Sequence, residues 1–227
     1  MDQIEKNTVS AKNQLKVTEY VTYINPEGKG KRFLFVGNSI TRHGRAPQIG
    51  WDHDFGMAAS AIEKDYVHLL QKMLEEKYPD AVICVCQAAA WERSYMNGKE
   101  SHAPFEAARD FGADYIVMRI VENCDRTILD HDVFLREYKS FVDFLNTNDA
   151  KIILTSGFWK HVGDEDIEKA AKERNYPFIA LGDLGEDDEM KAIGLFEHSG
   201  VANHPGDKGM QAIAERIFAL LADLLQE

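Results

Sequence analysis

Short apolar runs alternate along this chain with longer amphipathic segments. Five of the runs are apolar at nearly every position, which is typical of strands that are covered on both faces of a sheet. The runs span residues 33–37, 81–86, 115–118, 151–155 and 177–181. Their order, with amphipathic segments between them, favours a mostly parallel sheet.

Helical spacing fills the gaps between these runs. Apolar residues recur every three or four positions from Ile62 to Leu74, and Ser60 with Glu63 matches a capping box, which predicts a helix that begins directly after Ser60. Further helices are expected over 133–145, over 164–174 and from Lys208 onward. The alternation predicts an α/β fold, a three-layer α/β/α sandwich around a five-stranded, mostly parallel sheet.

The first thirty residues do not follow this rhythm. Residues 17–23 alternate between polar and apolar like a half-buried strand, and residues 26–28 resemble a turn. We therefore expect an N-terminal extension over 1–30 with a possible added strand, followed by one domain over 31–227. A chain of 227 residues suits one large domain.

Composition and charge restrict the partners. The net charge is −12, so nucleic acid is not an expected partner, because phosphate binding needs a concentrated basic surface. No run approaches the ~20 apolar residues of a membrane span, and the first residues lack the apolar core of a signal peptide. We expect no membrane partner and, by default, a cytoplasmic protein with three reduced cysteines. The oligomeric state is left open.

Three segments that follow strands or precede the last helix carry candidate chemistry. Ligands of open parallel sheets bind beyond the carboxyl ends of the strands. Gly37-Asn38-Ser39 follows the first apolar run, Asn123 follows the third, and His204-Pro205 directly precedes the terminal helix. A serine is a weak nucleophile until a base takes its proton, and histidine suits that task at neutral pH.

These segments resemble the SGNH/GDSL hydrolase superfamily, whose first block reads Gly-Asp-Ser or Gly-Asn-Ser and whose last block contains His-Pro. The resemblance covers about residues 31–226 and implies a flavodoxin-like fold. It implies Ser39 as the nucleophile and His204 as the base. It also implies an oxyanion hole made by the Ser39 N–H, an N–H near Ala89 and the side-chain amide of Asn123.

The chain departs from the superfamily pattern before the histidine. The superfamily commonly places an acid three residues before its histidine, and Val201 stands there in this chain. We predict a Ser-His dyad in which a backbone carbonyl near Val201 or Ala202 orients His204. The alternative is a carboxylate from elsewhere in the chain. The candidates are Glu92, Glu122, Glu197 and Asp207.

The resemblance implies a hydrolase of small O-acyl esters, with the O-acetyl groups of a neutral carbohydrate as the leading substrate class. An acyltransferase with the same site and an inactive carbohydrate-binding protein are the alternatives. Candidate substrate contacts are Asn38, Trp91, Glu122 and Trp159, although burial in the core is equally compatible with the tryptophans. No cofactor is expected, and the run over 51–54 lacks the spacing of a metal site.

Overall fold

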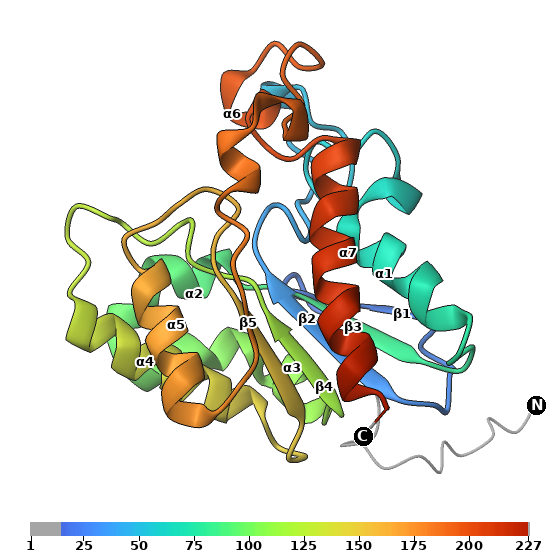
Figure 1. Ribbon diagram of the computed structural model, residues 1–227, viewed down its shortest axis with the longest axis vertical. Coiled ribbons are helices and arrows are strands. Elements are labelled where there is room, and N and C mark those ends of the chain that lie inside the picture. Colours follow the sequence, from blue (N-terminus) through green and yellow to red (C-terminus); the bar gives the residue numbers. More distant parts are fainter. Residues whose placement is uncertain (1–14, 227) are drawn as a thin grey trace, which may run out of the picture.

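The computed structural model describes residues 15–226 and contains a six-stranded sheet with the order β1-β3-β2-β4-β5-β6 (Figure 1). Strands β2 to β6 run parallel to their neighbours, and β1 pairs with β3 in the antiparallel direction. The strands are β1 (Val21–Ile24), β2 (Arg32–Gly37), β3 (Val82–Gln87), β4 (Tyr115–Met118), β5 (Lys151–Thr155) and β6 (Phe178–Ile179). The three-layer parallel fold is confirmed, with one strand more than the five predicted.

Helices cover both faces of this sheet (Figure 1). The α-helices are α1 (Tyr66–Glu75), α2 (Ala89–Ser94), α3 (Glu106–Asp110), α4 (His131–Leu145), α5 (Asp164–Arg174), α6 (Ser199–Ala202) and α7 (Asp207–Leu224). Short 3-10 segments are η2 (Pro47–Ile49), η3 (Ile62–Lys64), η4 (Tyr95–Phe105), η5 (Leu184–Glu186) and η6 (Asp188–Met190). One apolar core joins the sheet to α2, α3, α4 and α5, and a second core joins its other face to α1 and α7.

The extra strand comes from the N-terminal extension. In β1, Val21 lies opposite Cys86 of β3, so this part of the extension adds an edge to the same sheet. Residues 1–14 of the predicted extension lie outside the described residues. No helix within residues 15–226 combines the length and the apolar character that crossing a bilayer requires.

The predicted start of the first long helix is wrong. Helix α1 begins at Tyr66, and its cap is Asp65, whose carboxylate accepts the backbone N–H of His68 at 2.8 Å. The Ser60 hydroxyl donates instead to Asp207 at the start of α7, at 2.7 Å. Ser60 therefore makes a tertiary hydrogen bond to a residue 147 positions away instead of capping the helix that follows it.

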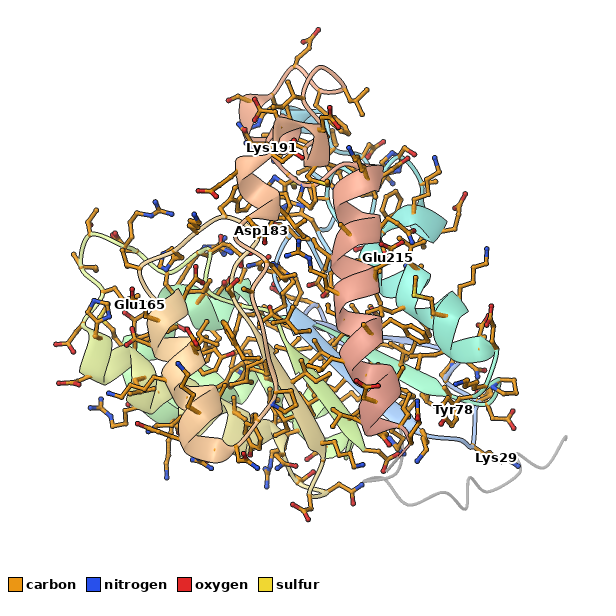
Figure 2. All side chains as sticks on the ribbon, viewed as in Figure 1. Lys29, Tyr78, Glu165, Asp183, Lys191 and Glu215 are labelled. Atoms are coloured by element: carbon orange, nitrogen blue, oxygen red, sulfur yellow. The ribbon has the colours of Figure 1, made fainter. Side chains whose placement is uncertain are left out.

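The parallel register brings three strand ends to one edge of the sheet. Gly37 at the end of β2 lies beside Gln87 at the end of β3, and Val36 lies beside Met118 at the end of β4. Residues that follow these strands therefore share one edge of the sheet. The segment after β6 that carries α6 stands at the top of the view in Figure 1, with Lys191 labelled on it in Figure 2.

Candidate active site

Ser39 sits in a tight turn at the end of β2. The Asn38 carbonyl accepts the N–H groups of Thr41 and Arg42 at 2.9 and 3.0 Å, which closes the turn. Gly37 is required at its start, because a Cβ atom there would lie 1.7 Å from the Thr41 Oγ1 atom. The turn leaves Ser39 half-buried at the edge of the sheet.

His204 reaches this serine from the other end of the chain. Its Nε2 atom lies 2.8 Å from Ser39 Oγ, across a sequence separation of 165 residues. Its Nδ1 atom lies 2.7 Å from the carbonyl oxygen of Gly200. A carbonyl only accepts hydrogen bonds, so Nδ1 carries the proton and Nε2 presents its lone pair to the serine hydroxyl.

The carbonyl that orients His204 is one residue earlier than the predicted position. Gly200 belongs to the four-residue helix α6, and a short turn after that helix brings His204 back so that its N–H reaches the Val201 carbonyl at 2.9 Å. The Val201 side chain is buried, so its position in the chain offers no polar group to the histidine. No carboxylate of residues 15–226 bonds to the His204 ring.

The surroundings keep His204 neutral. Burial lowers its pKa from 6.5 to about 4, and the hydrogen bond to Gly200 offsets only part of that effect. The edge of the Trp159 ring packs against the imidazole, with ring centroids 5.1 Å apart. A neutral imidazole at physiological pH is the form that can accept a proton.

A pocket of about 280 Å³ opens over the Ser39–His204 pair. Its walls come from four parts of the chain that are distant in sequence: the segment after β2, the β3–α2 junction, the segment after β4, and α6 with its flanks. The lining residues are Ser39, His43, Ile49, Met57, Gln87, Ala89, Arg93, Asn123, His198, Gly200, Val201 and His204. None of these side chains is a carboxylate, although the chain carries a net charge of −12.

The three residues expected to supply oxyanion donors all line this pocket. The Ser39 N–H bonds to no acceptor within the described part of the chain. The Ala89 N–H, at the start of α2, donates to the Gln87 side-chain oxygen at 3.1 Å. The Asn123 amide nitrogen donates to Glu92 at 2.6 Å, which leaves its second N–H without a partner among residues 15–226.

A buried polar network lies next to Ser39. The Asn38 side-chain nitrogen donates to Glu92 Oε1 at 3.0 Å and to Glu122 Oε2 at 2.5 Å. Arg119, which is fully buried, donates to Glu122 Oε1 at 2.5 Å and also to the Asn38 side-chain oxygen. Burial of carboxylates is costly without such partners, so this network fixes the segments after β2 and β4 against each other.

None of the four residues predicted to contact substrate lines the pocket. Asn38 and Glu122 belong to the buried network and line no part of the pocket. Trp91 is fully buried and stacks on Phe141 with ring centroids 4.9 Å apart, so the prediction that it contacts substrate is wrong and the core alternative holds. Trp159 is half-buried and packs on His204 rather than lining the pocket.

Sequence reasoning missed several residues of the site. Gln87, Arg93, His43 and His198 line the pocket, and none stands in a recognisable motif. A polar residue at the end of an otherwise apolar strand was the available signal for Gln87. Arg119 also follows directly after β4, but it is fully buried and holds Glu122 and Asn38 rather than lining the pocket.

The two acidic residues of the run over 51–54 form ion pairs with nearby arginines. Asp52 pairs with Arg45 and Asp54 pairs with Arg42, at 2.6 and 2.8 Å. Within residues 15–226, no three His, Cys, Asp or Glu side chains are grouped as metal ligands would be.

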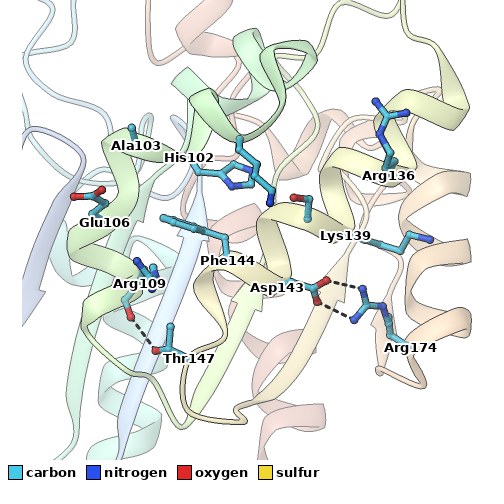
Figure 3. Close-up of a pocket in the computed structure, with 12 residues that line it drawn as sticks. His102, Ala103, Glu106, Arg109, Arg136, Lys139, Asp143, Phe144, Thr147 and Arg174 are labelled. Atoms are coloured by element: carbon cyan, nitrogen blue, oxygen red, sulfur yellow. Dashed lines mark hydrogen bonds and ion pairs between the residues drawn. The ribbon is translucent and has the colours of Figure 1, made fainter.

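A larger hollow of about 840 Å³ lies between η4, α3, α4 and α5, away from Ser39 (Figure 3). Asp143 and Arg174 face each other across it in a two-pronged ion pair, with N–O distances of 2.8 and 2.7 Å. The Arg109 guanidinium lies over the Phe144 ring. Ser140 and His102 both line this hollow, but His102 forms no hydrogen bond to Ser140 within the described chain.

Comparison with solved structures supports the fold. A two-domain esterase active on acetylated mannans aligns with a TM-score of 0.57 and 16% identity, over 87% of this chain and 51% of that chain. A salicylyl-acyltransferase, SsfX3, from a tetracycline biosynthetic pathway aligns with a TM-score of 0.57 and 18% identity, over 86% and 55%. The psychrotrophic esterase EstA from Pseudoalteromonas sp. aligns with a TM-score of 0.54 and 11% identity, over 87% and 100%.

The chain thus spans about half the length of the mannan esterase and the acyltransferase, and the whole of EstA. No protein-family model matches the sequence, and no curated protein matches it. The strand order, the helices on both faces and these structural neighbours lead to one conclusion: this chain has the fold of the SGNH/GDSL hydrolases.

Proposed function

We propose that this protein is a serine ester hydrolase with Ser39 as the nucleophile and His204 as the general base. The observation that carries the proposal is the 2.8 Å contact between Ser39 Oγ and His204 Nε2, with the imidazole held in the required tautomer by Gly200. A nucleophile within hydrogen-bond reach of an oriented base is the arrangement that acyl transfer requires.

In the proposed reaction, Ser39 Oγ attacks the ester carbonyl while His204 Nε2 takes the hydroxyl proton. The negative charge that forms on the carbonyl oxygen is stabilised by the Ser39 N–H, by the free N–H of Asn123 and by the Ala89 N–H once Gln87 has released it. The imidazolium then protonates the departing alcohol. Water, activated by the same histidine, attacks the acyl-enzyme and releases the acid.

For the substrate, we propose the O-acetyl or another short O-acyl ester of a carbohydrate. A pocket of about 280 Å³ suits a small acyl group better than a fatty chain. A structural neighbour acts on acetylated mannans, which supports the same substrate class here.

Acyl transfer to a second alcohol is the alternative, because the same dyad and oxyanion donors serve both reactions and one structural neighbour is an acyltransferase. Measuring how the acyl-enzyme partitions between water and an added sugar alcohol separates the two reactions. Ester formation that exceeds hydrolysis at low alcohol concentration would favour transfer.

A fluorophosphonate probe tests the nucleophile, because it reacts covalently with activated serines. We expect one labelled peptide, containing Ser39, and hydrolysis of p-nitrophenyl acetate that is lost in Ser39→Ala. The matched control is Ser140→Ala, at a half-buried serine on α4 that lines the separate hollow. Loss of the Ser39 hydroxyl should cost little stability, so a folded Ser39→Ala protein that keeps most of its kcat would refute the assignment.

A further inference from the structure

Glu92 is the hydrogen-bond partner of Asn123, the proposed oxyanion donor. It lies in α2, is fully buried, and lines no part of the pocket. Its Oε2 atom accepts the Asn123 side-chain N–H at 2.6 Å, and its Oε1 atom accepts the Asn123 backbone N–H at 3.3 Å. One carboxylate therefore holds both the backbone and the side chain of Asn123.

The other end of the Asn123 amide is also held. Arg93, the next residue of α2, donates from its guanidinium to the Asn123 side-chain oxygen at 3.1 Å. A flipped amide would place its oxygen against the Glu92 carboxylate and its nitrogen against the Arg93 cation, and both contacts would be repulsive. The amide orientation is therefore fixed, with one N–H on Glu92 and the other without a partner among residues 15–226, on a residue that lines the pocket.

Glu92 also joins this donor to the nucleophile turn. The Asn38 side-chain nitrogen, next to Ser39, donates to Glu92 Oε1 at 3.0 Å. Three N–H groups thus converge on two carboxylate oxygens. Such a set favours the ionised form of Glu92, because a carboxylate accepts on both oxygens and donates from neither.

We propose that Glu92 is a positioning residue that aims the free N–H of Asn123 at the acyl oxygen, a role that rests on the proposed esterase function. Glu92 itself touches no substrate. It acts by fixing the donor before the reaction begins, which is how preorganised donors stabilise a developing oxyanion.

The charge state of Glu92 gives this role a pH signature. Burial and the nearby negative charge of Glu122 raise the pKa of Glu92 to about 7, against the opposing effect of its amide donors. The surrounding charged or titratable groups are Arg93, Arg119, Glu122, Cys124 and Tyr138. Protonation would turn one acceptor into an O–H donor facing another donor, and would release Asn123.

The test compares Glu92→Gln, Asn123→Ala and the double variant with the unaltered protein, using p-nitrophenyl acetate. The glutamine side chain would keep the volume of Glu92 but offer one acceptor and one donor to three N–H groups. We expect kcat to fall by about 10- to 10²-fold in Glu92→Gln, with KM little changed. We expect a loss of about 10²- to 10³-fold in Asn123→Ala. The double variant should be no slower than Asn123→Ala, because both changes act through one N–H.

Two readouts separate positioning from a merely structural role. The unaltered protein should lose part of its kcat as the pH falls through about 7, and this step should be missing in Glu92→Gln. Thermal stability reports the structural cost separately: a modest fall is expected in Glu92→Gln because its amide faces an N–H donor, and the variant should remain folded at the assay temperature. The matched control is Glu137→Gln, which removes another buried acid, on α4, and should keep full kcat.

Labelling of Ser39 by the fluorophosphonate in every variant distinguishes the possible failures. If Ser39 is labelled and Glu92→Gln retains full kcat, or if the two losses multiply in the double variant, the positioning role of Glu92 is overturned while the esterase stands. If the unaltered protein neither reacts with the probe nor hydrolyses esters, both proposals are overturned together.

Discussion

The carbonyl oxygen of Gly200 lies 2.7 Å from Nδ1 of His204 and occupies the place that a carboxylate takes in a catalytic triad. It fixes the tautomer and the ring orientation, yet it brings no full negative charge to stabilise an imidazolium. The proposed site is therefore a dyad, and three of its four acid candidates, Glu92, Glu122 and Asp207, are hydrogen-bonded elsewhere. Asp207 bonds to Ser60 and Lys64, and Glu122 bonds to Arg119.

The first prediction concerns these acids. We expect that Glu92→Gln, Glu122→Gln, Glu197→Gln and Asp207→Asn each lose no more than about 10²-fold in kcat, because none of them contacts His204. Replacing a true triad acid by its amide lowers kcat by about 10⁴ in a serine protease. The measurement is kcat at saturating ester for each folded variant. A loss of about 10⁴-fold in one of them would identify that residue as the acid of a catalytic triad.

The second prediction is the acid limb of the pH profile. Because His204 must be neutral to act as base and burial lowers its pKa to about 4, kcat/KM should retain a measurable level at pH 5 and collapse as the pH falls through about 4. The limb should be measured in Glu92→Gln, because this variant is expected to lack the Glu92 step near pH 7. A midpoint close to the ordinary value of 6.5 would contradict the assignment.

The pH–rate measurement needs a control for unfolding, because the stability of the protein also depends on pH. The unfolded chain restores the His204 pKa to about 6.5, so between pH 6.5 and 4 it binds a proton that the folded chain does not. The free energy of unfolding should decline as the pH falls through this window. Circular dichroism at each pH must therefore show folded protein before a loss of rate is attributed to the base.

The third prediction concerns acyl length. Each added methylene strengthens binding by ~0.8 kcal/mol only when apolar walls receive it. The pocket is small, and His43, Arg93 and His198 form part of its wall. We expect kcat/KM on p-nitrophenyl esters to be highest for acetate or propionate and to fall toward decanoate. A steady rise toward decanoate would mean that an acyl channel exists and that the substrate class is wrong.

The fourth prediction concerns Gln87, whose side-chain oxygen occupies the Ala89 N–H. Substrate must displace this oxygen before the donor can serve the oxyanion. Since a net hydrogen bond is worth ~0.5–1.5 kcal/mol, Gln87→Leu should raise kcat/KM by about 2- to 10-fold. Gln71→Leu, at a glutamine on α1 that bonds to Glu75, is the control. A fall in kcat/KM would instead show that Gln87 assists the reaction.

Periodicity was sufficient to predict most of the fold. Strands β4 and β5 and helix α5 match their predicted bounds, because apolar runs and amphipathic spacing follow directly from burial. Helices α2, α3 and α6 were missed, since helices of six, five and four residues leave too few turns for a periodic signal. Two of these missed helices carry Glu92 and Gly200, which are the hydrogen-bond partners of Asn123 and His204.

The candidate site likewise contains residues that the sequence could predict and contacts that it could not. Ser39, His204 and Asn123 could be proposed because their segments resemble the SGNH/GDSL motifs and stand after strands or before a helix, where those motifs are expected. The contacts that orient them depend on which polar groups the fold buries together, and a buried glutamate looks in sequence like any surface glutamate. Trp91 shows the reverse error, because a tryptophan after a strand looks like a ligand contact until its stacking on Phe141 is seen.

The long separation between Ser39 and His204 has a consequence for the protein during its synthesis. The serine and its strand are made 165 residues before the histidine, which follows shortly after the carbonyl that orients it. A nascent chain that already displays the nucleophile has no base to activate it. The proposed hydrolase thus stays inert toward cellular esters until the segment from Gly200 to His204 has been translated and has docked.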